Sequence, residues 1–208
     1  LTVRDSLGRD ITVEKPPGRI ISLSPAHTEA FYAIGAGDKV VGTDDYSDYP
    51  PEAKSRPKVG YSNLDIEKIV SLQPDLVYAA TRQKRFVPEL EKVGLKVLYI
   101  EEPQSIEGVF GQIKDLGRIT NHTREAELLV DQMQKKTRAI QDKLASRNTG
   151  PRVFYELTPE LFTASPNSFI GDLLRTLKGQ NIAEGIDRPY PQLSLESGNP
   201  GRFSAGAA

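Results

Sequence analysis

The stretch TREAELLVDQMQKKTRAIQDKLASR, residues 123–147, decides how the rest of the chain must be organised. It contains no Gly and no Pro, and it is rich in Ala, Leu, Glu, Gln and Lys, which favour helix. About 24 residues at 1.5 Å each give a rod on the order of 35 Å long, enough to cross a small domain. The apolar residues whose spacing fits one helical face are Leu129, Met133, Ile140 and Leu144. The stretch therefore predicts a long helix that needs partners along one side.

Strand and helix signals alternate before this helix and begin to alternate again after it. A hairpin is predicted at residues 1–13, and residues 43–60 have the polar, Pro-containing composition of a loop. Compact apolar runs predict strands at residues 19–23, 39–42, 76–80, 96–100, 152–156 and 161–164. Helices are predicted between them at residues 30–34, 66–72, 85–93, 105–119 and 168–177. This βαβα series is typical of a mostly parallel sheet covered by helices.

The fold class that follows is α/β, with two Rossmann-like lobes joined by a single long helix. Residues 1–120 form the predicted N-terminal lobe, and residues 121–148 form the backbone helix. Residues 149–208 form a partial C-terminal lobe that ends in an irregular tail. Two residues are alternative candidates for the N-cap of the first helix. They are Ser24, with Pro25 at the first helical position, and Thr28, one register later.

Composition excludes several classes of protein. Lys and Arg number 27 and Asp and Glu number 28, and the two signs are interspersed, which argues against a nucleic-acid-binding surface. The absence of Cys excludes disulfides and thiolate metal sites, and two His are too few for a multi-histidine metal site. The chain begins with Leu1 rather than Met, as an exported protein without its signal segment or a trimmed form does.

Six segments, in order, resemble the helical-backbone (class III) substrate-binding proteins of ABC importers, which deliver cobalamin, haem and ferric siderophores. Before the long helix they are residues 5–42, TDDYSDYPPEA at 43–53 and NLDIEKIVSLQPDLVYA at 63–79. After it they are RVFYEL at 152–157, FTASPNSFIGDLL at 162–174 and RPYPQLSLE at 188–196. SDYPPEA and PYPQLSLE are most similar to the cobalamin-binding branch.

The resemblance implies a periplasmic or extracellular binder, lipid-anchored in its precursor, that captures a metal chelate and docks on an ABC permease. It implies no cofactor, a monomer, and a cleft between two lobes that the backbone helix holds nearly fixed. The sequence departs from the family after Glu196. In the family the segment at residues 193–196 starts a helix, whereas here it runs into Ser-Gly-Asn-Pro-Gly. The second lobe is therefore expected to be short of strands, and dimerisation through it stays open.

Aromatic residues in loops at strand ends are the first candidates for the ligand site, because open α/β sheets bind ligands there and flat chelates are held by stacking. The resemblance implies cleft-lining positions for Tyr46, Tyr61 and Tyr190. The alternative is that each ring packs on its own loop. Phe162 suits either the cleft or the core.

The first turn of the first helix offers polar candidates. Backbone N–H groups at Ser24, Ala26 and Thr28 can bind amide or phosphate groups of a ligand. His27 is a candidate axial ligand for Fe³⁺ or Co³⁺, or it only forms a hydrogen bond in that turn. Arg82 is either a polar contact at the rim of the site or, with its basic neighbours, solvated surface.

Glu67 and Glu196 match the carboxylates with which the family docks on permease arginines, although acidic residues near helix N-termini also simply stabilise a helix. The sequence contains no catalytic motif and so predicts no enzyme. The competing class is an α/β enzyme with a shortened second domain. Within the binding class, a corrinoid such as cobalamin is expected first, and haem or a ferric siderophore second.

Overall fold

The computed structural model describes residues 1–195 and 203–205. The chain divides into two compact units. Unit 1 comprises Leu1–Glu102 and Gln112–Asp131, and unit 2 comprises Pro103–Gly111 and Gln132–Ala208. The helix α5 (Ile106–Thr120) begins in unit 2 and ends in unit 1, and the helix α6 (Thr123–Lys143) begins in unit 1 and ends in unit 2.

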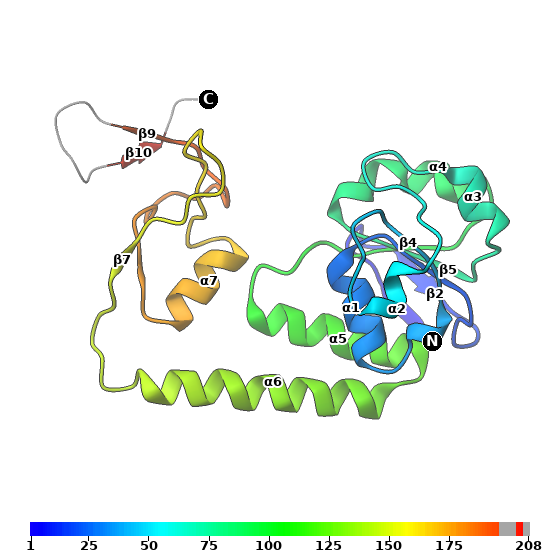
Figure 1. Ribbon diagram of the computed structural model, residues 1–208, viewed down its shortest axis with the longest axis horizontal. Helices are drawn as coiled ribbons and strands as arrows, with labels where there is room; N and C mark the ends of the chain where they lie inside the picture. Colours follow the sequence, from blue (N-terminus) through cyan, green and yellow to red (C-terminus); the bar gives the residue numbers. More distant parts are fainter. Residues whose placement is uncertain (196–202, 206–208) are drawn as a thin grey trace. The chain divides into compact units, whose positions relative to one another are not determined.

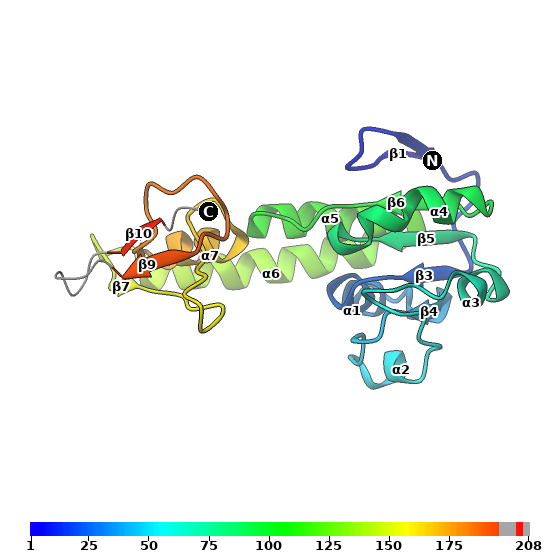
Figure 2. The same ribbon diagram turned by 90° about the horizontal axis from the view of Figure 1, so that it is seen from above.

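Unit 1 is built on a four-stranded parallel sheet, as predicted. Its strands are β3 (Ile20–Ser22), β4 (Val40–Thr43), β5 (Leu76–Ala79) and β6 (Val97–Tyr99). They lie in the order β4-β3-β5-β6, which Figure 2 shows side by side. Helices cover both faces of such a sheet, so its strands are apolar at nearly every position rather than alternating.

The helices of unit 1 lie on opposite faces of this sheet (Figure 1). The helices α3 (Ile66–Ser71) and α4 (Val87–Lys92) cover the face that carries Val77 and Ala79. The helix α1 (Pro25–Ala33) covers the other face, where its Phe31 ring meets the edge of Tyr78 at 5.6 Å between centroids. Successive residues of a strand point to opposite faces, which explains the division.

The ends of several elements differ from the sequence predictions. Ser24 is the N-cap residue of α1, so the first of the two capping alternatives is right, although its side chain makes no capping hydrogen bond. The loop at residues 43–60 contains a short helix, α2 (Pro51–Lys54). The 3-10 segments η1 (Gly37–Lys39) and η2 (Thr81–Phe86) precede β4 and α4. Pro88 lies near the start of α4, and a proline lacks the N–H of a regular helical turn. This accounts in part for the change from the 3-10 segment η2 to the α-helix α4 at this point.

The predicted N-terminal hairpin is confirmed. Its strands β1 (Thr2–Arg4) and β2 (Asp10–Thr12) pair antiparallel. The hairpin lies along the edge strand β6, because the backbone N–H of Ser6 donates to the carbonyl of Tyr99 at 2.9 Å. It thereby covers an edge that would otherwise expose unpaired backbone groups.

The junction between α5 and α6 depends on close approach. A Cβ at Gly117 of α5 would lie 2.4 Å from Cβ of Ala126 in α6. Asn121 takes a left-handed conformation with φ 63°, which Asn tolerates better than most residues. The His122 backbone N–H donates to the Gly117 carbonyl at 2.7 Å, so this histidine links the two helices.

The long helix α6 ends at Lys143, one turn before the predicted end. From Leu144 onward the backbone bonds connect residues three apart, as in a tight final turn. Lys178 closes this end by donating to the carbonyls of Ala145 and Arg147 at 3.1 and 2.7 Å. The expected exposure of Ile140 is confirmed at 46%, whereas Leu144 is half-buried.

Unit 2 contains a small βαβ arrangement. The strands β7 (Arg152–Val153) and β8 (Gln180–Asn181) pair parallel, and α7 (Phe169–Thr176) lies between them in the sequence. The Ser168 hydroxyl caps α7 by accepting from the Gly171 N–H at 3.0 Å. Asp172 of α7 accepts from the Ile106 N–H at 2.9 Å and so caps the start of α5.

The described end of the chain differs from the irregular tail expected there. The strand β9 (Leu193–Leu195) pairs antiparallel with β10 (Phe203–Ala205). Backbone pairing therefore orders these three tail residues, and the remainder of the tail lies outside the described residues. Within residues 1–195 and 203–205, no helix combines the length and the apolar character needed to cross a membrane.

Candidate ligand-binding site

The candidate site in unit 1 lies at the carboxyl ends of the parallel strands. The chain passes from β3 to β4 on one side, then returns past β3 to β5 on the other, so the strand order reverses between β3 and β5. Open α/β sheets bind ligands beside such a reversal, at the carboxyl edge. The loops that follow β3, β4 and β5 carry Ser24, Tyr46 and Arg82. The topology thus gathers several of the predicted site residues at one edge.

Three of the predicted residues meet in a cluster of aromatic and basic groups, in which Tyr46 and Arg82 are exposed and Tyr61 is half-buried. The rings of Tyr46 and Tyr61 lie edge to face, 4.8 Å apart between centroids and at 89°. The guanidinium carbon of Arg82 lies 5.4 Å from the Tyr61 ring centroid, which is a cation–π distance. Tyr46 is 64% exposed, so its ring faces solvent rather than the core. The cluster offers flat apolar surface next to a positive charge.

The backbone that carries Tyr61 is fixed on both sides. Gly60 has φ 92°, and a Cβ there would lie 1.9 Å from the carbonyl oxygen of Asn63, so only Gly fits the turn before Tyr61. The buried side chain of Gln83 donates from Nε2 to the Tyr61 carbonyl at 3.1 Å. The Arg85 guanidinium donates to the Ser62 carbonyl. The ring therefore projects from a rigid loop.

The residues predicted to bind ligand in the first turn of α1 differ in their exposure to solvent. Ala26 is exposed, whereas Ser24 and His27 are buried at 9% and 4% exposure. The His27 ring contacts Tyr78 edge to face at 4.7 Å, and its Nε2 lies 3.4 Å from Oε1 of Gln112. Burial lowers the pKa of His27, so the imidazole is neutral near pH 7. A role as axial metal ligand stays a prediction, and the inward position of the ring does not favour it.

This burial predicts a pH-dependent stability. Burial is the main cause of the lowered pKa of His27, and the Gln112 hydrogen bond and the Glu102 charge oppose it. The unfolded chain then binds more protons than the native chain below the unfolded pKa of about 6.5. The free energy of unfolding should therefore fall as pH drops below about 6.5, by at most about 1.4 kcal/mol per pH unit from this group.

Urea unfolding between pH 5 and 8 measures this slope. In His27→Gln, the free energy of unfolding should fall less steeply below about pH 6.5 than in the wild type. His122→Gln, the matched control at the only other histidine, should keep the wild-type slope. An unchanged slope in His27→Gln would contradict the assignment.

Phe162 and Tyr190 lie together in unit 2. Phe162 pairs with Gln192 in an antiparallel bridge, and Ser165 donates to the Pro189 carbonyl at 2.9 Å in the same register. On the other side, Glu156 pairs with Thr163. Directly opposed residues share a face, so this register puts four partly exposed side chains on one face. They are Tyr155, Leu157, Phe162 and Tyr190, at 37–44% exposure.

Sequence reasoning missed two members of this apolar face, Tyr155 and Leu157. On the opposite face of the same segments, Thr163 and Leu193 are buried at 0% and 3% exposure. The signal was the alternation Tyr155-Glu156-Leu157, which is only three residues long. It gains meaning only once the register of the neighbouring segments is known.

Of the two carboxylates predicted to dock on a permease, only Glu67 lies within the described residues. Glu67 is exposed in the first turn of α3, behind the N-cap Asp65, which accepts from the Lys68 N–H at 2.9 Å. Glu196 lies outside the described residues. The docking role of both stays a prediction.

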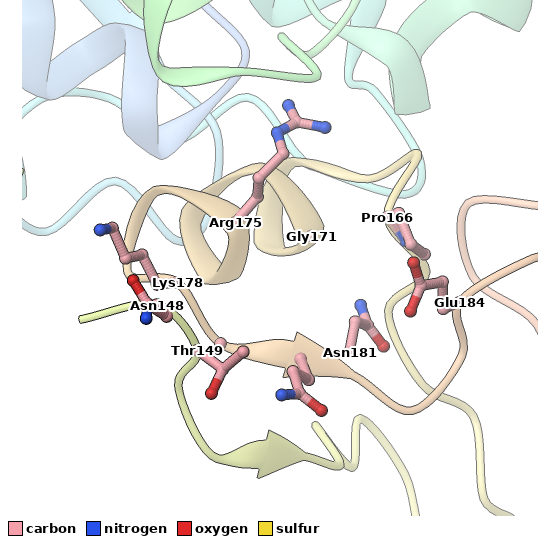
Figure 3. A pocket seen from close by; sticks show the side chains of 10 residues that line it. Asn148, Thr149, Pro166, Gly171, Arg175, Lys178, Asn181 and Glu184 are labelled. Carbon is pink, nitrogen blue, oxygen red and sulfur yellow. The ribbon is translucent and has the colours of Figure 1, made fainter.

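A cavity of about 390 Å³ in unit 2 lies beside α7 and β8 (Figure 3), and three of its polar lining residues already have partners. Lys178 closes the end of α6, Arg175 pairs with Asp172, and Asn181 donates to the Ala164 carbonyl at 2.7 Å. Figure 3 shows the Arg175 side chain directed away from Asn181 and Glu184. The lining of the cavity also lacks aromatic residues. The cluster of Tyr46, Tyr61 and Arg82 in unit 1 is therefore the better candidate for a ligand site.

The sequence matches the family described as "Periplasmic binding protein" over residues 20–198. The chain belongs to the periplasmic binding protein family. An uncharacterised ABC transporter substrate-binding lipoprotein of Bacillus subtilis is 34% identical over 191 residues, covering 88% of the chain and 61% of the relative. A cobalamin-binding protein of Halobacterium salinarum is 32% identical over 203 residues, covering 94% of the chain and 55% of the relative.

Solved structures of this family share the fold. The periplasmic vitamin B12-binding protein of Vibrio cholerae superposes with a TM-score of 0.74 at 28% identity, covering 86% of the chain and 71% of that protein. The haem-binding protein BhuT, in complex with two haems, superposes with a TM-score of 0.74 at 26% identity, covering 85% and 70%.

Membership in this family confirms the resemblance and the two-lobed α/β class inferred from the sequence. The family's description agrees with the expected periplasmic or extracellular location, and one relative is a lipoprotein. The chain spans 61% and 55% of the lengths of the two curated relatives that it matches here.

Proposed function

We propose that the chain captures a corrinoid such as cobalamin outside the cytoplasm and delivers it to an ABC permease. The observation that carries the proposal is the cluster of Tyr46, Tyr61 and Arg82 at the carboxyl edge of the unit 1 sheet. The similarity to cobalamin-binding and vitamin B12-binding proteins supports this ligand class. The role is binding, not catalysis, in keeping with a family of binding proteins.

The chemistry of the cluster suits a flat macrocycle with polar substituents. Tyr rings bury large area at a small cost in side-chain entropy, and their faces and edges complement a conjugated ring system. Arg82 can donate several hydrogen bonds to amide, carboxylate or phosphate oxygens at the ligand's periphery. The apolar face of unit 2, defined by Tyr155, Leu157, Phe162 and Tyr190, supplies a second surface of the same kind.

Haem or a ferric siderophore is the second candidate ligand. Its support is the similarity to a haem-binding protein and the charge of Arg82, which suits carboxylates. Calorimetric titration of the chain with cyanocobalamin, haemin and a ferric hydroxamate siderophore separates the candidates. We expect cyanocobalamin to bind most tightly. If haemin binds most tightly, haem replaces the corrinoid as the proposed ligand. If none of the three compounds binds, both candidate ligand classes are refuted.

The proposed partner is the permease of an ABC importer. Glu67 is exposed on α3, so its carboxylate can meet a permease arginine. Glu196 is proposed for the same role on the second lobe. A monomer remains the expected state of the chain.

A further inference from the structure

We propose that Asp44 is a positioning residue that holds Tyr46 in its ligand-binding orientation, an inference that rests on the proposed function. The need for such a residue follows from exposure. Tyr46 is 64% exposed and meets Tyr61 only at its edge, so packing alone does not fix its ring. An exposed ring keeps one position only if its backbone is held.

Asp44 provides this hold through both carboxylate oxygens. Oδ1 accepts from the Tyr46 backbone N–H at 2.8 Å, and Oδ2 accepts from the Ser47 hydroxyl. The Asp44 backbone N–H donates to the carbonyl of Ser22, the last residue of β3, at 3.1 Å. Asp44 is 0% exposed. The carboxylate therefore folds the loop after β4 into a compact turn attached to the central sheet.

A chain of buried hydroxyls continues this attachment into α1. Oγ of Ser47 lies 2.9 Å from Oγ1 of Thr28, which lies 2.8 Å from Oγ of Ser22. All three side chains are at most 1% exposed. A buried polar network with every member partnered is rigid, because breaking one bond strands a polar group away from water.

Lys58 braces the same loop from its other side. Its ammonium donates to Oγ1 of Thr43 at 3.0 Å and to the carbonyl of Ser47. The segment on both sides of Tyr46 is thus tied to β3, β4 and α1, whereas the ring itself is left free for a ligand. This is the arrangement expected of a binding residue on a preorganised loop.

Amide hydrogen exchange tests the anchoring without any ligand. In Asp44→Ala the Tyr46 amide should exchange about tenfold faster than in the wild type, since a freed amide loses its protection. In the milder Ser47→Ala the same amide should exchange faster by a smaller factor, because the Asp44 carboxylate that accepts from it loses its Ser47 partner. Thr120→Val is the matched control, because it removes a buried hydroxyl at the α5–α6 junction, away from this loop. Unchanged exchange at Tyr46 in the first two variants would overturn the proposal.

A double-mutant cycle with cyanocobalamin as the probe tests the link to binding. Asp44→Ala should raise the Kd about tenfold in the wild-type background and change it less than about twofold in the Tyr46→Ala background. Equal losses in both backgrounds would show a general structural role and overturn the proposal. If Asp44→Ala does not fold, Ser47→Ala is used in the same cycle. If the wild type does not bind cyanocobalamin, the proposed corrinoid function fails, and the exchange measurement alone decides the anchoring.

Discussion

Replacing Tyr46 and Tyr61 together by Ala is expected to weaken cyanocobalamin binding by about 100-fold or more. Each ring that stacks on a ligand contributes roughly 1.5–3 kcal/mol through buried area and ring contact. The two rings touch each other at 4.8 Å between centroids, so each also supports the position of the other. Isothermal titration calorimetry of the single and double variants measures the loss.

Tyr49→Ala is the matched control for this prediction. Tyr49 lies in the same loop and has the same 64% exposure as Tyr46, but it is not part of the ring pair that Tyr46 forms with Tyr61. We expect its removal to change the Kd by less than about threefold. A loss as large for Tyr49→Ala as for Tyr46→Ala would mean that the loop as a whole, and not the ring pair, carries the affinity.

Gly117→Ala is expected to lower the free energy of unfolding by about 2 kcal/mol, although Ala normally favours a helix over Gly. The added Cβ would lie 2.4 Å from Cβ of Ala126 and 2.9 Å from the His122 carbonyl oxygen. The two helices would have to separate, and the contact that joins α5 to α6 within unit 1 would loosen. Urea denaturation of the variant measures the change.

Gly111→Ala, in the same helix, provides the opposite outcome. A Cβ at Gly111 meets no atom within 4 Å, so only the helix propensity changes. This variant should be more stable than the wild type by roughly 0.5–1 kcal/mol. Equal effects at the two glycines would show that helix propensity, and not the close approach of α5 and α6, determines stability at Gly117.

The architecture of unit 1 was predictable because its signals are local and redundant. Each buried strand, such as β5, is a continuous apolar run, and each is followed by a helix with its own start signal. The long helix was predictable for the same reason, except at its end. Residues near Ser146 have no strong stop signal, and the tight final turn depends on Lys178, which lies 31 residues beyond Arg147.

The organisation of unit 2 was less accessible to sequence reasoning. Its strands β7 and β8 are two residues long, too short to display a period. Their pairing joins residues 28 positions apart, such as Arg152 with Gln180. The apolar face that includes Tyr155 and Leu157 arises from this kind of distant register, which a single sequence does not reveal.

The candidate site shows the same division between local and distant information. Sequence reasoning named Tyr46 and Tyr61 as cleft-lining rings and Arg82 as either a rim contact or solvated surface, and the structure brings the three side chains together. The sequence alone could not show that His27 points into the core. A position in the first turn of a helix leaves the direction of the ring undetermined until Tyr78 and Gln112 are placed around it. The position of the buried Asp44 is likewise defined by partners from other elements, such as the carbonyl of Ser22 in β3.

Titration of the wild-type chain with cyanocobalamin, monitored by calorimetry, tests whether Tyr46 and Tyr61 form a corrinoid-binding site. We expect saturable binding that the Tyr46→Ala, Tyr61→Ala double variant weakens by about 100-fold or more and the Tyr49→Ala variant retains. A double variant that binds as tightly as the wild type would contradict the assignment of the site, and a wild-type chain that shows no binding would contradict the proposed function.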